Sequence, residues 1–281
     1  MRRPVTTVDR VTALILFLAA FIALGAAQRT QGVMRDEAYY FKAAEEQWAW
    51  FEQFGDDKLR GDMANKYNIA RYWSYNNEHP PLFKTLSGLS WRIFHGYQPV
   101  GPGKDAVYHA QWKHAHEAID IMSEVSAFRL PAWFLTALCV AFIYLFGARL
   151  EGRLCGFSAA LIYLTIPRVF FHGPLCAFAS PIVTLWLLTV YAYFRALSRP
   201  SWALICAVFF GLALATKHNS WFIPPVLVLH YLMVVWPDMS LRPFSPPRVP
   251  LVFLAMLFIG PVIFLATWPW LWFDTVEHLR G

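Results

Sequence analysis

Charge is scarce in this sequence. Only 15% of its 281 residues are charged and 57% are hydrophobic, whereas an ordinary soluble domain has about 25% charged and about 45–50% apolar residues. The composition therefore excludes an ordinary soluble domain and indicates a chain surrounded by lipid. Internal repeats and low-complexity segments are also lacking, and the lack of repeats disfavours an alternating-access transporter.

Patterns typical of metal sites are lacking as well. The four cysteines lie in or beside apolar stretches without zinc-ligand spacing, so we expect them to behave as small hydrophobic residues. His109, His114, His116 and Glu117 are of metal-ligand types. However, His114 and His116 are two residues apart and would diverge on a helix. We therefore expect no metal held by the protein and no firmly implied cofactor.

The net charge of +6 and the pI near 9.2 raise the possibility of a nucleic-acid partner. The position of the charges argues against it. Of the 18 acidic residues, 13 lie between Arg35 and Ser126, where basic residues nearly balance them. The surplus bases stand between apolar runs, as topology determinants do. We expect membrane lipid as a partner and no nucleic acid.

Apolar runs long enough, or nearly long enough, to cross a bilayer define the predicted architecture. There are seven of them: Val11–Ala27, Ala127–Gly147, Leu154–Phe171, Pro181–Leu197, Ser201–Thr216, Asn219–Trp236 and Pro250–Trp270. The prediction is an all-α integral membrane protein with about seven transmembrane helices, in one domain over residues 1–281. The proline-rich tract from Pro237 to Pro250 is expected to be a loop.

Arginine pairs predict the orientation. With the N-terminus cytoplasmic, every short connection on that side carries two arginines, as the positive-inside rule requires. The segment 28–126 then forms a large outer loop. Within it, Pro80–His95 is predicted to be a helix on the membrane surface, with Lys84 and Arg92 on its polar face. The first apolar run also resembles a cleaved signal peptide, although its core exceeds the usual length.

Two polar motifs stand in the outer loop. Arg35–Phe41 begins with the adjacent carboxylates Asp36 and Glu37, of which one could act as a general base while the other supports it. The alternative is a plain helix start, since acids favour a first turn. Asn76–Lys84 places Glu78, His79 and Lys84 around two prolines that suit the start of a helix. Its alternative is a helix break with incidental polar residues.

Together the two motifs resemble the first outer loop of the GT-C glycosyltransferase superfamily. More narrowly, the chain is similar to protein O-mannosyltransferases and lipid A aminoarabinose transferases. The resemblance continues through Arg129–Pro131, Gly152–Pro167 and Gly211–Lys217. It implies an inverting transfer of a sugar from a polyprenyl-phosphate donor at the outer face of a membrane, here a bacterial inner membrane. The acceptor would be a hydroxyl on a protein, a lipid or a glycan.

The resemblance also implies roles for individual residues. Asp36 takes the position of the general base, with Glu37 as its supporting partner. Lys217, at the outer boundary of an apolar helix, would stabilise the departing phosphate, although snorkelling to the interface is an equal alternative. The further candidates for binding substrate or phosphate are His79, Lys84, Arg35, Glu78 and Arg168.

Two departures from the family pattern bear on activity. The family carries another acid near the outer start of the fourth span, but Pro174–Pro181 has none, so either Ser180 or His172 substitutes for it or activity is weakened. Family members also continue beyond the position of Gly281, so the chain is expected to be an amino-terminal half. A catalytically inactive scaffold or fragment is therefore the first alternative, and a transporter is the second.

Overall fold

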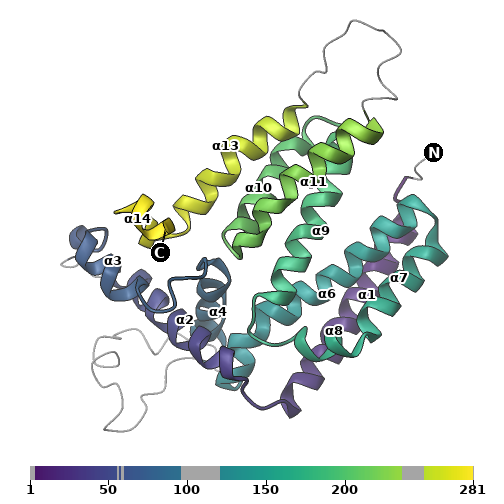
Figure 1. The fold of residues 1–281 in the computed structure, drawn as a ribbon. Helices are drawn as coiled ribbons and strands as arrows, with labels where there is room; N and C mark the ends of the chain where they lie inside the picture. Colours follow the sequence, from purple (N-terminus) through teal and green to yellow (C-terminus); the bar gives the residue numbers. More distant parts are fainter. Residues whose placement is uncertain (1–3, 56, 58–59, 96–120, 236–249, 281) are drawn as a thin grey trace, which may run out of the picture.

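The computed structural model describes residues 4–55, 57, 60–95, 121–235 and 250–280. Within these residues the chain forms helices and turns and no strand (Figure 1). Besides the helices introduced below, there are short helical turns: η1 (Gln28–Thr30), η2 (Arg60–Asp62), η4 (His218–Phe222), η5 (Tyr231–Val235) and η6 (Pro269–Leu271). The all-helical part of the prediction is confirmed for these residues.

The first group of helices contains α1 (Thr7–Ala27), α6 (Glu124–Leu150) and α7 (Arg153–Thr165), which lie side by side in Figure 1. α1 begins with a capping box in which Thr6 and Asp9 exchange hydrogen bonds. Asp9 also accepts a 2.7 Å bond from Arg153, which ties the start of α7 to the start of α1. α6 and α7 meet closely at Gly147, where a Cβ would lie 2.7 Å from the Cα of Gly156.

The second group contains α9 (Ala179–Ala196), α10 (Trp202–Leu214), α11 (Ile223–His230) and α13 (Leu251–Ala266). Its core includes Phe210, and a Cβ on Gly260 would meet the Phe210 ring at 2.5 Å. Glycine at that position therefore lets α10 and α13 approach each other. α9 packs on α6 and joins the two groups. The short helix α8 (Pro167–His172) follows α7 directly, and Pro167 stands in its first turn.

The remaining helices cover one end of both groups (Figure 1). They are α2 (Arg35–Gln53), α3 (Lys66–Trp73), α4 (Leu82–Phe94) and α14 (Thr275–Arg280). α4 packs between α2 and α6. The crossing of α2 and α4 is close at Gly88, where a Cβ would lie 2.5 Å from the carbonyl oxygen of Ala44. We call these four helices the polar layer. The contact between α4 and α6 holds this layer against the apolar helices.

Within the described residues, which exclude Trp236, the seven predicted apolar runs fall on helices, but these helices differ in length. By length and composition alone, two segments of the described chain could cross a membrane, Thr7–Thr30 and Glu124–Leu150. The apolar helices α7, α10 and α13 are shorter, at 10–17 residues. The total of seven spans and the orientation therefore remain predictions.

The predicted surface helix Pro80–His95 is a helix, α4, but one part of that prediction is wrong. Lys84 was expected on the polar face, and its side chain is 0% exposed. Arg92 is partly exposed and forms an ion pair with Glu52 on α2. α4 turns Lys84 inward because the loop before this helix offers three oxygen acceptors to its ammonium group.

Candidate functional site

A buried ion pair fixes the start of α2. Glu37 and Arg129 are 1% and 0% exposed, and both oxygens of the carboxylate accept hydrogen bonds from the guanidinium, Nε to Oε1 at 2.7 Å and Nη2 to Oε2 at 2.6 Å. This is the bidentate geometry in which a charged pair is strongest. The remaining Arg129 donors bond to the carbonyl oxygens of Gln28, Gln31 and Gly32 at 2.8–3.1 Å. Arg129 therefore joins α6 to the connection between α1 and α2.

Two main-chain N–H groups complete the surroundings of Glu37. Met34 donates to Oε2 at 2.9 Å and Cys176 donates to Oε1 at 2.8 Å. Cys176 lies in the stretch Pro174–Pro181, which lacks the family's acid. Instead, this stretch supplies a main-chain N–H group that binds the acid Glu37 of α2. Four donors therefore hold the Glu37 carboxylate, and with it the first turn of α2 that also carries Asp36.

Asp36 and Arg35 point outward from the first turn of α2, and both side chains are exposed. Tyr40 lies one turn further along and is buried. Burial, together with the Asp36 carboxylate and Glu78, raises the pKa of Tyr40 to about 12. The Tyr40 hydroxyl therefore stays protonated at neutral pH, beside a carboxylate that is open to solvent.

Lys84 organises the turn before α4. Its Nζ donates to the carbonyl oxygen of Asn76 at 2.5 Å, to the Asn76 side chain at 3.2 Å and to the carbonyl oxygen of His79 at 3.0 Å. Asn76 has a φ of 52°, in the left-handed region that asparagine tolerates better than most residues. Burial lowers the pKa of Lys84 to about 7, against a smaller opposing effect of Glu78. The ammonium group is thus directed at the protein main chain.

The ring of His79 lies near the rings of Tyr40 and Phe178. Its ring centroid lies 6.5 Å from that of Tyr40 and 5.1 Å from that of Phe178. Burial lowers the pKa of His79, and the positive charges of Lys84 and Lys217 lower it further. His79 is therefore neutral at pH 7 and can donate one ring N–H to a ligand.

The segment after α10 contacts the turn before α4. The N–H of Leu82 donates to the carbonyl oxygen of Ala215 at 3.1 Å, which joins the start of α4 to the end of α10. Lys217 follows and is partly exposed. The ring of His218 hydrogen-bonds to the backbone of Glu78, and burial lowers the pKa of His218.

We refer to Asp36, Tyr40, Glu78, His79, Lys217 and His218 as the Asp36 cluster. Three segments far apart in the chain supply it: the first turns of α2, the turn before α4 and the residues after α10. A carboxylate, neutral imidazoles and a lysine can together accept a proton and stabilise an anion. His218 was missed by the sequence analysis, although it follows Lys217 directly at the same helix end. Arg35 and Arg168 are exposed and make no hydrogen bond or ion pair with the described residues of the cluster.

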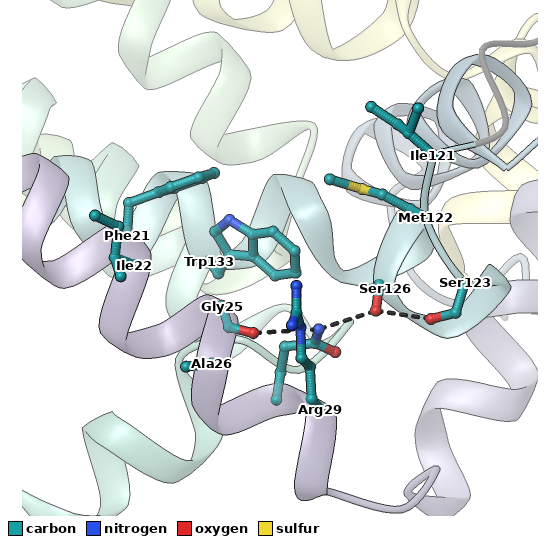
Figure 2. Close-up of a pocket in the computed structure, with 11 residues that line it drawn as sticks. Phe21, Ile22, Gly25, Ala26, Arg29, Ile121, Met122, Ser123, Ser126 and Trp133 are labelled. Atoms are coloured by element: carbon teal, nitrogen blue, oxygen red, sulfur yellow. Dashed lines mark hydrogen bonds between the residues drawn. The ribbon is translucent and has the colours of Figure 1, made fainter.

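A pocket of about 620 Å³ lies at the end of α1 (Figure 2). Phe21 and Trp133 give it apolar walls, and the Arg29 side chain points toward Trp133 in this view. Gln28 also lines the pocket and donates a hydrogen bond to Ser126 at 2.9 Å. The lining combines an apolar wall with a cation. None of the Asp36 cluster residues lines it.

In the described part of the chain, no three histidine, cysteine, aspartate or glutamate side chains gather as a metal site would require. The residues His109, His114, His116 and Glu117 lie outside the described residues. The candidate site is the Asp36 cluster.

Comparison with known proteins identifies a family. Residues 119–270 match the family model described as dolichyl-phosphate-mannose-protein mannosyltransferase. The match covers the helices from α6 to α13 and includes Arg129, Lys217 and His218. The searches of curated proteins and of solved structures gave no match.

Proposed function

Because the chain belongs to the dolichyl-phosphate-mannose-protein mannosyltransferase family, we propose that it moves a sugar from a polyprenyl phosphate to an acceptor hydroxyl, with Asp36 as the general base. Family membership makes the chain a membrane glycosyltransferase of the mannosyltransferase type. The observation that carries the finer proposal is the proximity of Asp36, His79 and Lys217, which come from three separate segments. The Asp36 carboxylate raises the pKa of Tyr40, the Tyr40 ring centroid lies 6.5 Å from that of His79, and the charge of Lys217 lowers the pKa of His79.

The proposed reaction is a single displacement. The acceptor oxygen attacks the anomeric carbon from the face opposite the phosphate, so the configuration inverts. As the new C–O bond forms, the acceptor proton passes to the Asp36 carboxylate. Asp36 is suited to this step because its side chain is exposed, while Glu37 and Arg129 hold the turn that carries it.

The leaving group takes the electrons of the broken bond as a polyprenyl phosphate. Lys217 is a cation at the edge of the Asp36 cluster and would stabilise this charge as it develops. His79 supports it as a neutral N–H donor, since burial and the neighbouring lysines lower its pKa. Lys84 contributes indirectly, because its ammonium group fixes the turn that presents Glu78 and His79.

The membrane setting follows from the same proposal. With the N-terminus cytoplasmic, α1 places Asp36 just beyond the outer end of the first span. A polyprenyl tail would then remain in lipid while the sugar phosphate reaches the cluster. An acceptor protein, lipid or glycan would approach from the aqueous side, where Asp36 is exposed.

The test is sugar transfer in membranes that contain the full chain and a radiolabelled polyprenyl-phosphate sugar. Asp36→Asn should lower turnover by roughly 10²- to 10⁴-fold, the range associated with loss of a general base. Asp62→Asn removes another exposed acid from the same polar segment and should leave turnover unchanged. Expression and detergent extraction of both variants should match the wild type.

Two results would contradict the proposal. Turnover by Asp36→Asn within threefold of the wild type would exclude Asp36 as the base. Absence of product from folded, abundant wild-type chain, with a family member active in parallel, would indicate a scaffold without transferase activity.

A further inference from the structure

A second pocket lies at the opposite end of the helices from the Asp36 cluster, where α1 begins and α6 and α9 end. Its volume is about 540 Å³. Four of its eleven lining residues are arginines and none is acidic. The arginines are Arg10, Arg149, Arg195 and Arg199. They come from different parts of the chain, and only folding brings them to one pocket.

The turn after α9 places two of these arginines. The carbonyl oxygen of Arg195 accepts hydrogen bonds from the N–H groups of Ser198 and Arg199, at 3.1 and 2.9 Å. The carbonyl oxygen of Arg199 then accepts from the N–H of Trp202 at 3.0 Å. These bonds define a compact turn from the end of α9 to the start of α10, so both guanidinium groups are carried on ordered backbone.

Arg195 is held by stacking rather than by an acid. Its guanidinium carbon lies 4.7 Å from the centroid of the Trp202 ring, a distance at which a cation and an aromatic face attract each other. The Nε of Arg195 is buried and has no hydrogen-bond partner among the described residues. A buried donor without a partner is costly, so this position favours an acceptor supplied from outside the chain.

The local charge balance also favours an anion. Arg149 and Arg195 stand in the last turns of α6 and α9, where each helix end contributes roughly half a negative charge. Arg10, Arg195 and Arg199 alone exceed the two helix ends by about two charges. The nearby Asp9 is paired with Arg153 at 2.7 Å.

We propose that this pocket binds the phosphate group of an anionic membrane lipid. Basic pockets between membrane helices are known sites for such head groups. Phe142 and Leu145 form an apolar part of the lining, and Tyr191 and Trp202 are of the aromatic types that collect at membrane interfaces. A soluble phosphate would need the arginines alone, whereas a lipid would use both the arginines and the apolar wall.

This role differs from that of a topology determinant. Arginines that only set orientation need to be on one side of the membrane, and no specific affinity follows from them. A binding site instead requires that the loss of particular arginines weakens binding of one class of lipid. The two roles can therefore be separated by measuring affinity in purified protein, where insertion is already complete.

The experiment uses the full chain in neutral detergent and measures binding of dioctanoyl-phosphatidylglycerol, with dioctanoyl-phosphatidylcholine and inorganic phosphate in parallel. The double variant Arg195→Gln/Arg199→Gln should bind phosphatidylglycerol roughly 10- to 30-fold more weakly than the wild type, at about fivefold for each arginine. The control Arg71→Gln removes an exposed arginine of α3, outside this pocket, and should bind as the wild type does. Arg199→Gln alone alters only an exposed side chain, so it tests the site if the double variant fails to fold.

The outcomes separate the possibilities. Tight binding of phosphatidylglycerol, weak binding of phosphatidylcholine and loss in the variants support a lipid site. Binding of inorganic phosphate as tight as that of phosphatidylglycerol would retain a phosphate site but assign it to a soluble ligand. Equal phosphatidylglycerol affinity in the wild type, the double variant and Arg199→Gln would overturn the proposal and leave the arginines as topology determinants.

Discussion

Glu37→Gln should be among the most damaging single changes in the described part of the chain. The carboxylate of Glu37 accepts from two Arg129 nitrogens and from the N–H groups of Met34 and Cys176. Glutamine has the same shape but only one acceptor oxygen, so its NH₂ group must face at least one of these donors. The change also leaves the guanidinium of Arg129, which is 0% exposed, without its counter-charge.

The expected loss follows from that burial. Removing one partner of a buried ion pair costs about 3–5 kcal/mol, mainly because the other charge remains in the interior. Arg129→Met should be costly for the same reason, since it leaves the Glu37 carboxylate with two main-chain donors. The double variant Glu37→Gln/Arg129→Met removes both charges. Its cost should therefore be at least about 2 kcal/mol smaller than the sum of the two single costs.

The assay is unfolding in mixed micelles with increasing sodium dodecyl sulfate, followed by the fluorescence of the 13 tryptophans. Glu52→Gln provides a comparison, because Glu52 pairs with Arg92 where both side chains are more accessible, at 13% and 11%. Its cost should be smaller than that of Glu37→Gln. Single costs at Glu37 and Arg129 that add to within about 0.5 kcal/mol would refute the coupling.

Two further predictions concern the polar layer. The pKa of Lys84 is about 7 in the folded chain and about 10.4 in an unfolded one, so the unfolded chain binds more protons between these values. The free energy of unfolding of the wild type, relative to that of Lys84→Met, should therefore rise as pH increases above 7, by up to about 1.4 kcal/mol per pH unit. Unfolding measurements from pH 6 to 9 test this. If the difference in unfolding free energy between the two proteins does not change over that range, the burial of Lys84 is contradicted. Gly88→Ala would bring a Cβ within 2.5 Å of the Ala44 carbonyl oxygen and should cost about 1–3 kcal/mol by forcing α2 and α4 apart. Gly61→Ala, with no atom within 4 Å of the new Cβ, is the matched control, and equal thermal stability of the two variants would exclude the close crossing.

The positions of the apolar helices could be predicted because they depend on local composition. Runs of apolar residues gave the locations of apolar helices such as α1 and α6, but not that of the polar helix α2. The lengths were less predictable. The run Leu154–Phe171 is divided between α7 and α8 at Ile166, where the backbone leaves the helical region. A hydropathy profile does not register such a break.

The candidate site was only partly predictable because its contacts join distant segments. The two motifs identified Asp36, Glu78 and His79, and these residues do lie in one region of the structure. The sequence analysis named Arg129 only as part of the resemblance, and its partner Glu37 is 92 residues away in the sequence. Partners at such separations follow from tertiary packing and leave no periodic signal in the sequence.

Burial distinguishes between cations that the sequence treats alike. Lys84, Arg129 and Lys217 all stand near the ends of apolar segments, where any of them could have met a phosphate. Arg129 is neutralised by Glu37, and Lys84 is enclosed by the oxygens of its own turn. Lys217 is partly exposed beside His79, where its charge lowers the pKa of that ring. Among these three, Lys217 is therefore the cation that a phosphate can reach without first displacing a structural contact.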